Sequence, residues 1–128
     1  MIVITFGTFD LLHIGHINIL ERASKLGDKL IVGISTDKFT FNKKNKYPVY
    51  NENDRKKILE SLKFVDKVFF EESFEGKREY IKNNNADILV MGNDWEGRFD
   101  EFSDTCKVVY LERTPNISTT DVISNIKK

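Results

Sequence analysis

The chain has two histidines, His13 and His16, and both lie in the segment GTFDLLHIGH near its start. With a spacing of three they share one face of a first helical turn. Free backbone N–H groups and the helix dipole favour a phosphate at such a turn. Two imidazoles there could donate hydrogen bonds to phosphate oxygens and stabilise the charge of a transition state. The alternatives are two surface histidines, or a metal pair that lacks the further ligands of a zinc site.

A second candidate anion site is the segment RTPNISTT near the end of the chain. The guanidinium group of Arg113 can donate two parallel hydrogen bonds to a phosphate. Ser118, Thr119 and Thr120 begin a predicted helix, whose free N–H groups favour an anion. The alternative is an ordinary capping box between Ser118 and Asp121. The two readings are compatible, and together with the histidines they indicate a polyphosphate held between two helix N-termini.

The segment GNDWEG contains Asp94 and the sole tryptophan, Trp95, between two glycines. An aromatic ring beside a carboxylate could contact a nucleobase, since a carboxylate accepts from the exocyclic amine of cytosine. The alternative is that Trp95 only packs and Asp94 only caps a turn.

Basic residues gather in the middle of the chain. Lys43, Lys44 and Lys46 lie in a polar stretch, Arg55 lies on the next predicted helix, and Lys77 lies on a later one. Such residues usually form a solvated face. Beside a triphosphate they could also close over the phosphates and neutralise a leaving group.

The elements that position these residues alternate along the chain. Apolar runs predict strands, and amphipathic spacing or capping signals predict helices. We expect strands at 2–6, 29–34, 65–70, 87–91 and 107–111, helices from 17 to Gly27, from Asn51 to about 62, over 75–84 and from Ser118, and a long loop over 37–50.

This alternation predicts a single-domain α/β fold, a Rossmann-like, doubly wound, parallel five-stranded sheet with helices on both faces. Ligands of such sheets bind beyond the carboxyl ends of the strands, at the switch in strand order. The candidate residues follow predicted strands, which is the placement that this rule requires.

Composition narrows the function classes. The 128 residues favour one domain over 1–128. The formal net charge is zero, which disfavours non-specific binding to nucleic acid or membranes. Cys106 is the single cysteine, so we expect no internal disulfide and a reducing cytoplasm. No signal peptide or apolar run of membrane-spanning length is expected.

Three of these motifs, GTFD with HIGH, the tryptophan segment GNDWEGRFD, and RTPNISTT, resemble the cytidylyltransferase family of nucleotidyltransferases over nearly the whole chain. The HxGH signature alone is specific only to the superfamily, which includes adenylyltransferases and class I aminoacyl-tRNA synthetases. The tryptophan segment, the ISTT ending and the short length narrow the resemblance to members that act on glycerol 3-phosphate.

The resemblance implies a reaction in which CTP and sn-glycerol 3-phosphate give CDP-glycerol and pyrophosphate with Mg²⁺. The acceptor phosphate attacks the α-phosphorus of CTP in line, without a covalent enzyme intermediate. The family is usually homodimeric, and its product feeds glycerol-phosphate polymers of the cell surface. The metal ligands stay open, and Mg²⁺ would be held mainly by the CTP phosphates.

The resemblance also assigns roles to residues of this chain. The catalytic set would be His13, His16, Arg113 and Lys43. The CTP site would comprise Thr8, Phe9, Asp10, Gly15, Asp94, Arg113, Thr114, Ile117, Ser118, Thr119 and Thr120. The acceptor site would comprise Lys43, Lys46, Arg55, Lys77 and Trp95, with Asp37 and Asp66 in support.

The sequence departs from the family pattern at three positions. Asn93 stands where an aspartate is common, Asn116 where a glycine is usual, and Phe74 where close relatives carry tryptophan. Two further hypotheses therefore stay open: a cytidylyl- or adenylyltransferase for another small phosphate such as phosphoethanolamine, or a nucleotide-binding module without catalysis. A Rossmann dehydrogenase is disfavoured because no G-x-G-x-x-G follows the first strand.

Overall fold

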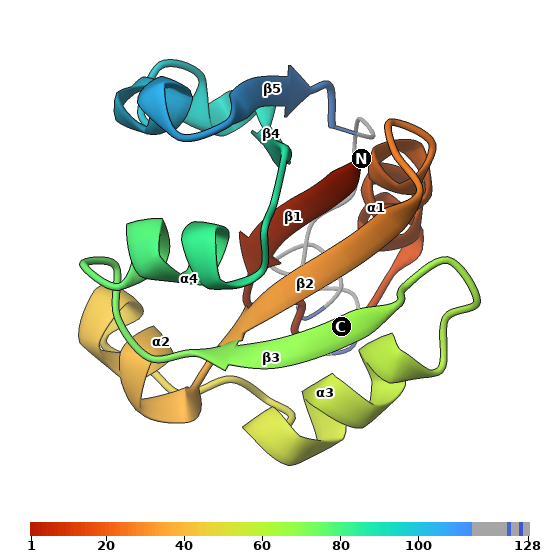
Figure 1. The fold of residues 1–128 in the computed structure, drawn as a ribbon. Helices are drawn as coiled ribbons and strands as arrows, with labels where there is room; N and C mark the ends of the chain where they lie inside the picture. Colours follow the sequence, from red (N-terminus) through yellow and green to blue (C-terminus); the bar gives the residue numbers. More distant parts are fainter. Residues whose placement is uncertain (114–122, 124–125, 127–128) are drawn as a thin grey trace.

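A parallel five-stranded sheet forms the middle layer of the molecule (Figure 1). The computed structural model describes residues 1–113, 123 and 126. The strand order is β3-β2-β1-β4-β5, and the strands are β1 (Ile2–Gly7), β2 (Lys29–Ser35), β3 (Lys67–Glu71), β4 (Ile88–Gly92) and β5 (Lys107–Leu111). All five predicted strands are confirmed, with shifts of one or two residues at their ends.

Helices cover both faces of this sheet, as the sequence predicts. Helices α1 (Ile14–Ser24) and α3 (Glu52–Glu60) pack on one face. Helix α4 (Lys77–Asn83) and the 3₁₀ helix η2 (Asp100–Asp104) pack on the other. The core is correspondingly split into two clusters, and neighbouring residues of β1 serve different ones: Val3 packs with Leu20 and Leu59, and Ile4 packs with Ile81.

The prediction of a long loop over residues 37–50 is wrong for its first part, which forms the helix α2 (Asp37–Lys44). The Thr36 side chain accepts from the backbone N–H of Phe39 at 3.1 Å, and Asn45 ends the helix in the left-handed conformation at φ 58°. Only Phe39 and Thr40 are buried in the helix. So short an apolar face leaves almost no periodic signal in the sequence.

Helix α1 also ends earlier than predicted, at Ser24 with Lys25 as its C-cap. Gly27 therefore does not stop the helix. A Cβ atom at Gly27 would lie 2.5 Å from the carbonyl oxygen of Met1, so glycine is needed here for a close backbone approach. The predicted helix from Ser118 lies outside the described residues. Among the described residues, no helix has the length and apolar character to span a membrane.

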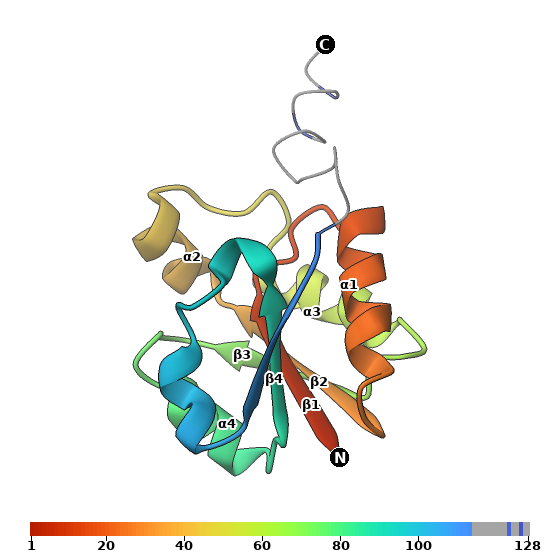
Figure 2. The ribbon, with the colours of Figure 1, turned by 90° about the horizontal axis from the view of Figure 1, so that it is seen from above.

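The switch in strand order falls at β1, which pairs with β2 on one side and with β4 on the other. The chain moves outward from β1 to β2 and β3, then returns to β4 and continues to β5. Figure 2 shows the loop after β1, helix α2 and the 3₁₀ helix η1 (Asn93–Trp95) at the end of the sheet away from the N-terminus. This is the end at which ligands of such sheets bind.

Candidate active site

The loop between β1 and α1 folds back on itself. Phe9 and Leu11 adopt positive φ values of 51° and 48°, a conformation that is costly for non-glycine residues and collects at functional sites. A Cβ atom at Gly7 would lie 2.8 Å from the Phe9 ring. Gly7 therefore lets the ring of Phe9 lie against the end of β1, where its edge meets His16 with ring centroids 5.4 Å apart.

His13 and His16 cap helix α1 reciprocally. The Nδ1 atom of His13 accepts from the backbone N–H of Gly15 at 3.0 Å, and Nδ1 of His16 accepts from the backbone N–H of His13 at 3.2 Å. Their rings stack with centroids 3.8 Å apart. The prediction that both histidines share one face of the first turn is confirmed, with His13 as the N-cap and His16 at the third helical position.

The hydrogen bonds of this cap determine which ring nitrogen carries the proton in each neutral imidazole. A neutral imidazole whose Nδ1 accepts a hydrogen bond carries its proton on Nε2. Burial lowers the pKa of His16 to about 3, and the positive charges of Arg113, Lys44 and, once it is protonated, His13 add to that shift. At neutral pH His16 is therefore an uncharged Nε2–H donor held in a fixed orientation, which is the kind of preorganised dipole that stabilises developing negative charge.

Asp10 joins this loop to the segment that precedes α3. Its buried carboxylate accepts from the backbone N–H groups of Val49 at 2.6 Å, Tyr50 at 2.9 Å and Leu11 at 3.1 Å. The structure thus shows Asp10 as a clamp between two loops, and its predicted contact with CTP stays a prediction.

Arg55 of α3 is the largest fully buried side chain among the described residues, and its hydrogen bonds join it to several segments. Its guanidinium donates to the carbonyl oxygens of Thr8 at 2.9 Å, Ser35 at 2.8 Å and Tyr50 at 3.0 Å. It also pairs with the Asp37 carboxylate at 2.7 Å. Arg55 and Asp37 therefore brace the carboxyl ends of β1 and β2, and direct contact of Arg55 with an acceptor stays a prediction.

The basic stretch of the sequence is split between a helix and a connector. Lys43 and Lys44 lie on α2, and the exposed Lys46 follows it. The Lys43 ammonium donates to the Ser35 hydroxyl at 3.1 Å and lies 4.3 Å from the centre of the Phe39 ring. Burial lowers the pKa of Lys43 to about 8, although the charge of Glu71 opposes that shift.

Glu71 and Lys77 form a buried ion pair beside Lys43. The Lys77 ammonium lies 2.6 Å from Oε2 of Glu71, and the two side chains are 4% and 2% exposed for lysine and glutamate respectively. Burial raises the pKa of Glu71 and lowers that of Lys77, while each partner's charge opposes the shift of the other. Glu71 ends β3 opposite Ser35 in the sheet register, so the pair lies at the same edge as Lys43 and Arg55.

The ends of β4 and β5 carry a further group of predicted site residues. Asp94 lies on η1 and faces Arg113 across 3.6 Å, with both side chains about half exposed. The ring of Trp95 is also half exposed and lies 5.8 Å from that of Phe99. Because the charge of Arg113 contributes to the lowered pKa of His16, these strand ends and the histidine pair act on one another electrostatically.

A model of the cytidylyltransferase-like family matches residues 4–125. The chain belongs to the cytidylyltransferase-like family. It is 52% identical over 124 residues to the glycerol-3-phosphate cytidylyltransferase of Bacillus subtilis strain 168, an alignment that covers 97% of this chain and 95% of that protein. It is 48% identical over 120 residues to the enzyme of the same name from Staphylococcus aureus strain NCTC 8325 / PS 47, covering 94% and 90%.

A solved structure agrees with this assignment. The lipopolysaccharide core biosynthesis protein from Thermoplasma volcanium GSS1 superposes with a TM-score of 0.75 and 30% sequence identity, covering 89% of this chain and 98% of that chain. The Rossmann-like parallel sheet predicted from the sequence is therefore confirmed.

Within this cytidylyltransferase-like fold, the predicted site residues fall into three groups. Thr8, Phe9, Asp10, His13, Gly15 and His16 gather after β1, Asp94, Trp95 and Arg113 after β4 and β5, and Lys43, Arg55, Lys77 and Asp37 after β2 and β3. Asp66 lies at the opposite end of the sheet, where it accepts from the backbone N–H of Leu30 at 2.8 Å. Thr114 and Ile117 to Thr120 lie outside the described residues.

Sequence reasoning assigned no role to two residues that contact the predicted site residues. Ser35 binds Lys43 through its hydroxyl and Arg55 through its carbonyl, and Glu71 neutralises Lys77. Their only signal was their position at the ends of apolar strands. A serine and a glutamate at such positions ordinarily indicate only that the chain returns to solvent.

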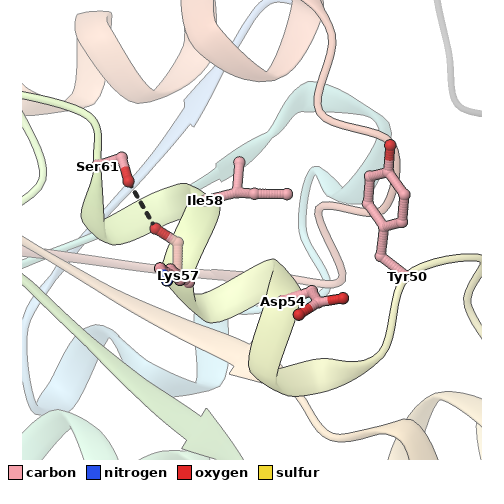
Figure 3. Close-up of a pocket in the computed structure, with 5 residues that line it drawn as sticks. All are labelled: Tyr50, Asp54, Lys57, Ile58 and Ser61. Atoms are coloured by element: carbon pink, nitrogen blue, oxygen red, sulfur yellow. Dashed lines mark hydrogen bonds between the residues drawn. The ribbon is translucent and has the colours of Figure 1, made fainter.

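A surface pocket lies beside α3 (Figure 3), and its lining includes Tyr50, whose backbone contacts Asp10 and Arg55. It is lined by Tyr50, Asp54, Lys57, Ile58 and Ser61. In the figure Tyr50 and Ile58 stand on the same side of the helix, and Ser61 donates back to the carbonyl of Lys57. None of the predicted site residues lines this pocket.

Proposed function

We propose that this chain is a glycerol-3-phosphate cytidylyltransferase, which transfers the cytidylyl group of CTP to sn-glycerol 3-phosphate. The observation that carries the proposal is the 52% identity to the Bacillus subtilis enzyme of that name over 97% of this chain. The reciprocal histidine cap and the cluster of basic groups at the same end of the sheet support it, because both suit phosphates.

The reaction is one substitution at phosphorus. A phosphate oxygen of glycerol 3-phosphate forms a bond to the α-phosphorus of CTP, and the bond from that phosphorus to the bridging oxygen breaks. Pyrophosphate takes the electron pair, and the products are CDP-glycerol and pyrophosphate. The attacking phosphate is already ionised at neutral pH, so the enzyme needs no general base and acts by positioning and charge stabilisation.

The two imidazoles have the properties that this reaction needs. His13 and His16 are fixed as Nε2–H donors by the hydrogen bonds that their Nδ1 atoms accept. They donate to phosphate oxygens of CTP and strengthen these bonds as negative charge builds in the transition state. Arg113, with Thr8 and the later segment from Thr114 to Thr120, completes the proposed nucleotide site, and Trp95 and Asp94 border it.

The basic groups serve the acceptor and the leaving phosphates. Lys43 is held by Ser35, and Lys46 lies on the exposed connector after α2. We assign these ammonium groups to the phosphate of glycerol 3-phosphate or to the β- and γ-phosphates of CTP. Arg55 acts as a positioning residue, since its donors hold the loops that carry Thr8 and Tyr50.

Mg²⁺ is part of the proposal as a partner of the nucleotide. Among the described residues, no group of three or more His, Cys, Asp or Glu side chains could hold a metal ion. Mg²⁺ usually keeps waters and binds substrate phosphates with few protein carboxylates, so we assign it to the CTP phosphates. When bound, it neutralises charge on the departing pyrophosphate.

The assay that tests the proposal measures pyrophosphate release from CTP with and without glycerol 3-phosphate. We expect release that depends on both substrates, that falls strongly with ATP in place of CTP, and that is lost in His16→Ala. The absence of acceptor-dependent release above the His16→Ala background would contradict the proposal. Binding of CTP without turnover would favour a nucleotide-binding module instead.

The wider assignments follow from the same proposal. Residues 1–128 form one nucleotidyltransferase domain that acts in the cytoplasm as a homodimer. Its CDP-glycerol serves the synthesis of glycerol-phosphate polymers of the cell surface. Light scattering of the purified protein tests the homodimer, and we expect a mass of twice that of the monomer.

A further inference from the structure

Helix α2 has only a small apolar anchor, although it carries two lysines at the proposed phosphate site. Phe39 and Thr40 are its only buried residues, and Lys43 and Lys44 lie in its last turn. Burial of so little apolar surface contributes little to holding a helix in one orientation. The direction of the last turn therefore depends on the polar contacts that hold the start of the helix.

A carboxylate from α3 holds the start of α2. Oε1 of Glu52, the first residue of α3, accepts from the backbone N–H of Asp37, the first residue of α2, at 2.8 Å. The first N–H groups of a helix have no partner inside it, and the dipoles of both helices favour a negative charge at this point. The side chain of Asp37 is held by Arg55, also from α3, at 2.7 Å. Two residues of α3 therefore fix the backbone and the side chain at which α2 begins.

The hydrogen bond from Asp37 to Glu52 also closes a loop. The two residues are 15 positions apart, and the chain between them comprises α2 and a largely exposed connector over 45–51. Asp10 holds the last part of this connector, since its carboxylate accepts from the backbone N–H groups of Val49 and Tyr50. Surface loops whose ends are joined in this way are compact and frequently functional. We call residues 37–52 the lysine loop.

The lysine loop carries its ammonium groups to the proposed phosphate site. Lys43 donates to the hydroxyl of Ser35, the last residue of β2. The charge of Lys44 contributes to the lowered pKa of His16, and Lys46 follows on the exposed connector. A tilt of α2 would therefore displace ammonium groups from the phosphates that they are proposed to bind.

We propose that Glu52 is a positioning residue of this enzyme, which acts through the backbone N–H of Asp37 to set where the lysine loop meets the substrate phosphates. Its role requires no contact with either substrate. The inference rests on the proposed function and deepens it, since it assumes that the lysines bind phosphates of CTP or of glycerol 3-phosphate.

Positioning and a simple charge effect predict opposite results for the loss of the Glu52 carboxylate. A negative charge near lysines weakens the binding of a phosphate, so its removal alone would lower KM. A carboxylate that fixes α2 strengthens the binding of a phosphate, so its removal raises KM. The sign of the change in KM therefore separates the two roles.

The first test compares three variants in the pyrophosphate-release assay. In Glu52→Ala we expect KM for glycerol 3-phosphate or for CTP to rise at least ~5-fold, part of the free energy of one hydrogen bond to a charged group, while kcat changes less than ~2-fold. Glu52→Gln keeps an oxygen that can accept from the same N–H and should retain the wild-type KM. Glu60→Ala, the control, removes an exposed carboxylate from the other end of α3 and should also retain it.

Three results would overturn the inference. The first is an unchanged or lowered KM for both substrates in Glu52→Ala. The second is a KM in Glu52→Gln that matches Glu52→Ala, because the charge and not the hydrogen bond would then matter. The third is a fall in kcat with both KM values unchanged, which is the result of losing folded protein.

The second test needs no substrate. Trypsin cleavage at Lys43, Lys44 and Lys46 under native conditions should be at least ~5-fold faster in Glu52→Ala than in the wild type, Glu52→Gln or Glu60→Ala, because a loop without its closing bond opens more often. Equal rates, or an equal rise at lysines outside the lysine loop, would overturn the inference. Failure of the proposed function looks different, since wild type would then release no pyrophosphate with glycerol 3-phosphate while the cleavage rates still followed residue 52.

Discussion

Two groups of polar side chains at the carboxyl end of the sheet differ in how they carry charge. The histidine cluster of Phe9, His13 and His16 keeps His16 uncharged at neutral pH, and its polar atoms are fixed by backbone hydrogen bonds of 3.0 and 3.2 Å. The buried-charge cluster of Arg55, Glu71 and Lys77 consists of full charges that are each paired with an opposite charge, Arg55 with Asp37 and Lys77 with Glu71. The exposed Lys43 borders this cluster through its hydrogen bond to the Ser35 hydroxyl.

The difference follows from what each group must do. Neutral donors can be buried at moderate cost and still meet the charge that appears only in the transition state. Permanent cations bind a phosphate in the ground state, but they must be braced and partly neutralised to be buried at all. The histidine cluster should therefore govern turnover, and the buried-charge cluster should govern stability.

Arg55→Met should have the largest effect of the changes considered. It leaves the carbonyls of Thr8 and Ser35 without their donor and Asp37 without its partner. Breaking a buried charged network in this way costs roughly 3–5 kcal/mol of unfolding free energy. Urea unfolding measures it. The control is Arg22→Met, which loses one bond to the carbonyl of Glu112 at the surface and should cost under ~1 kcal/mol. If the two variants lost the same free energy of unfolding, the proposal that Arg55 braces the strand ends would be contradicted.

The next effect is kinetic and concerns His16→Asn. The asparagine oxygen can still accept from the backbone N–H of His13, so the helix cap is kept while the Nε2–H donor is lost. We expect kcat to fall by about 10²-fold or more with a small change in Tm. Initial rates of pyrophosphate release give kcat. An unchanged kcat in His16→Asn would contradict the catalytic role of His16 and show that it serves only to cap the helix.

The pH dependence of stability tests the uncharged state of the histidine cluster. Burial holds the pKa of His16 at about 3 in the native state, against 6.5 for an unperturbed histidine. The unfolded chain therefore takes up a proton first, and stability is lost as pH falls below 6.5. The expected loss is about 2 kcal/mol between pH 7 and pH 5 beyond that of His16→Asn, which lacks the group. Urea unfolding at both pH values of both proteins checks it, and parallel curves would contradict the lowered pKa.

Ser35→Ala should have the smallest effect. The change removes the hydroxyl that orients the Lys43 ammonium at 3.1 Å and keeps the carbonyl that binds Arg55. The loss of one such bond, about 1 kcal/mol, should lower kcat/KM for glycerol 3-phosphate by ~5-fold. The matched control, Ser61→Ala, removes an exposed hydroxyl bond on α3 and should leave kcat/KM unchanged. An unchanged kcat/KM for glycerol 3-phosphate in Ser35→Ala would contradict the assignment of Lys43 to the acceptor.

The histidine cluster was readable from the sequence because all its parts are local. His13, Gly15 and His16 lie within one turn, and the strand that precedes them is a clear apolar run. The parallel sheet was readable for the same reason, since each strand carries its own signal. The predicted residues from Thr114 to Thr120 lie outside the described part of the chain, so their roles stay predictions.

The buried-charge cluster was only partly readable, because its contacts join residues that are distant in sequence. Arg55 contacts Thr8 across 47 positions, and nothing near either residue in the sequence indicates that contact. The segment Glu71–Glu72 resembles any acidic turn, yet Glu71 is 1% exposed. Helix α2 escaped prediction because its buried face holds only two residues. Tertiary packing determines these features, and local pattern does not.

The protonation of the two histidines is the property on which the proposed catalysis depends, because both must act as neutral, oriented Nε2–H donors. The chain contains only two histidines, so a long-range ¹H–¹⁵N NMR spectrum recorded from pH 7.5 down to pH 4 observes each ring without overlap. We predict that both rings carry the proton on Nε2 at neutral pH and that His16 stays neutral down to pH 4. Titration of His16 near pH 6.5, or a proton on Nδ1 of either ring at neutral pH, would contradict this role.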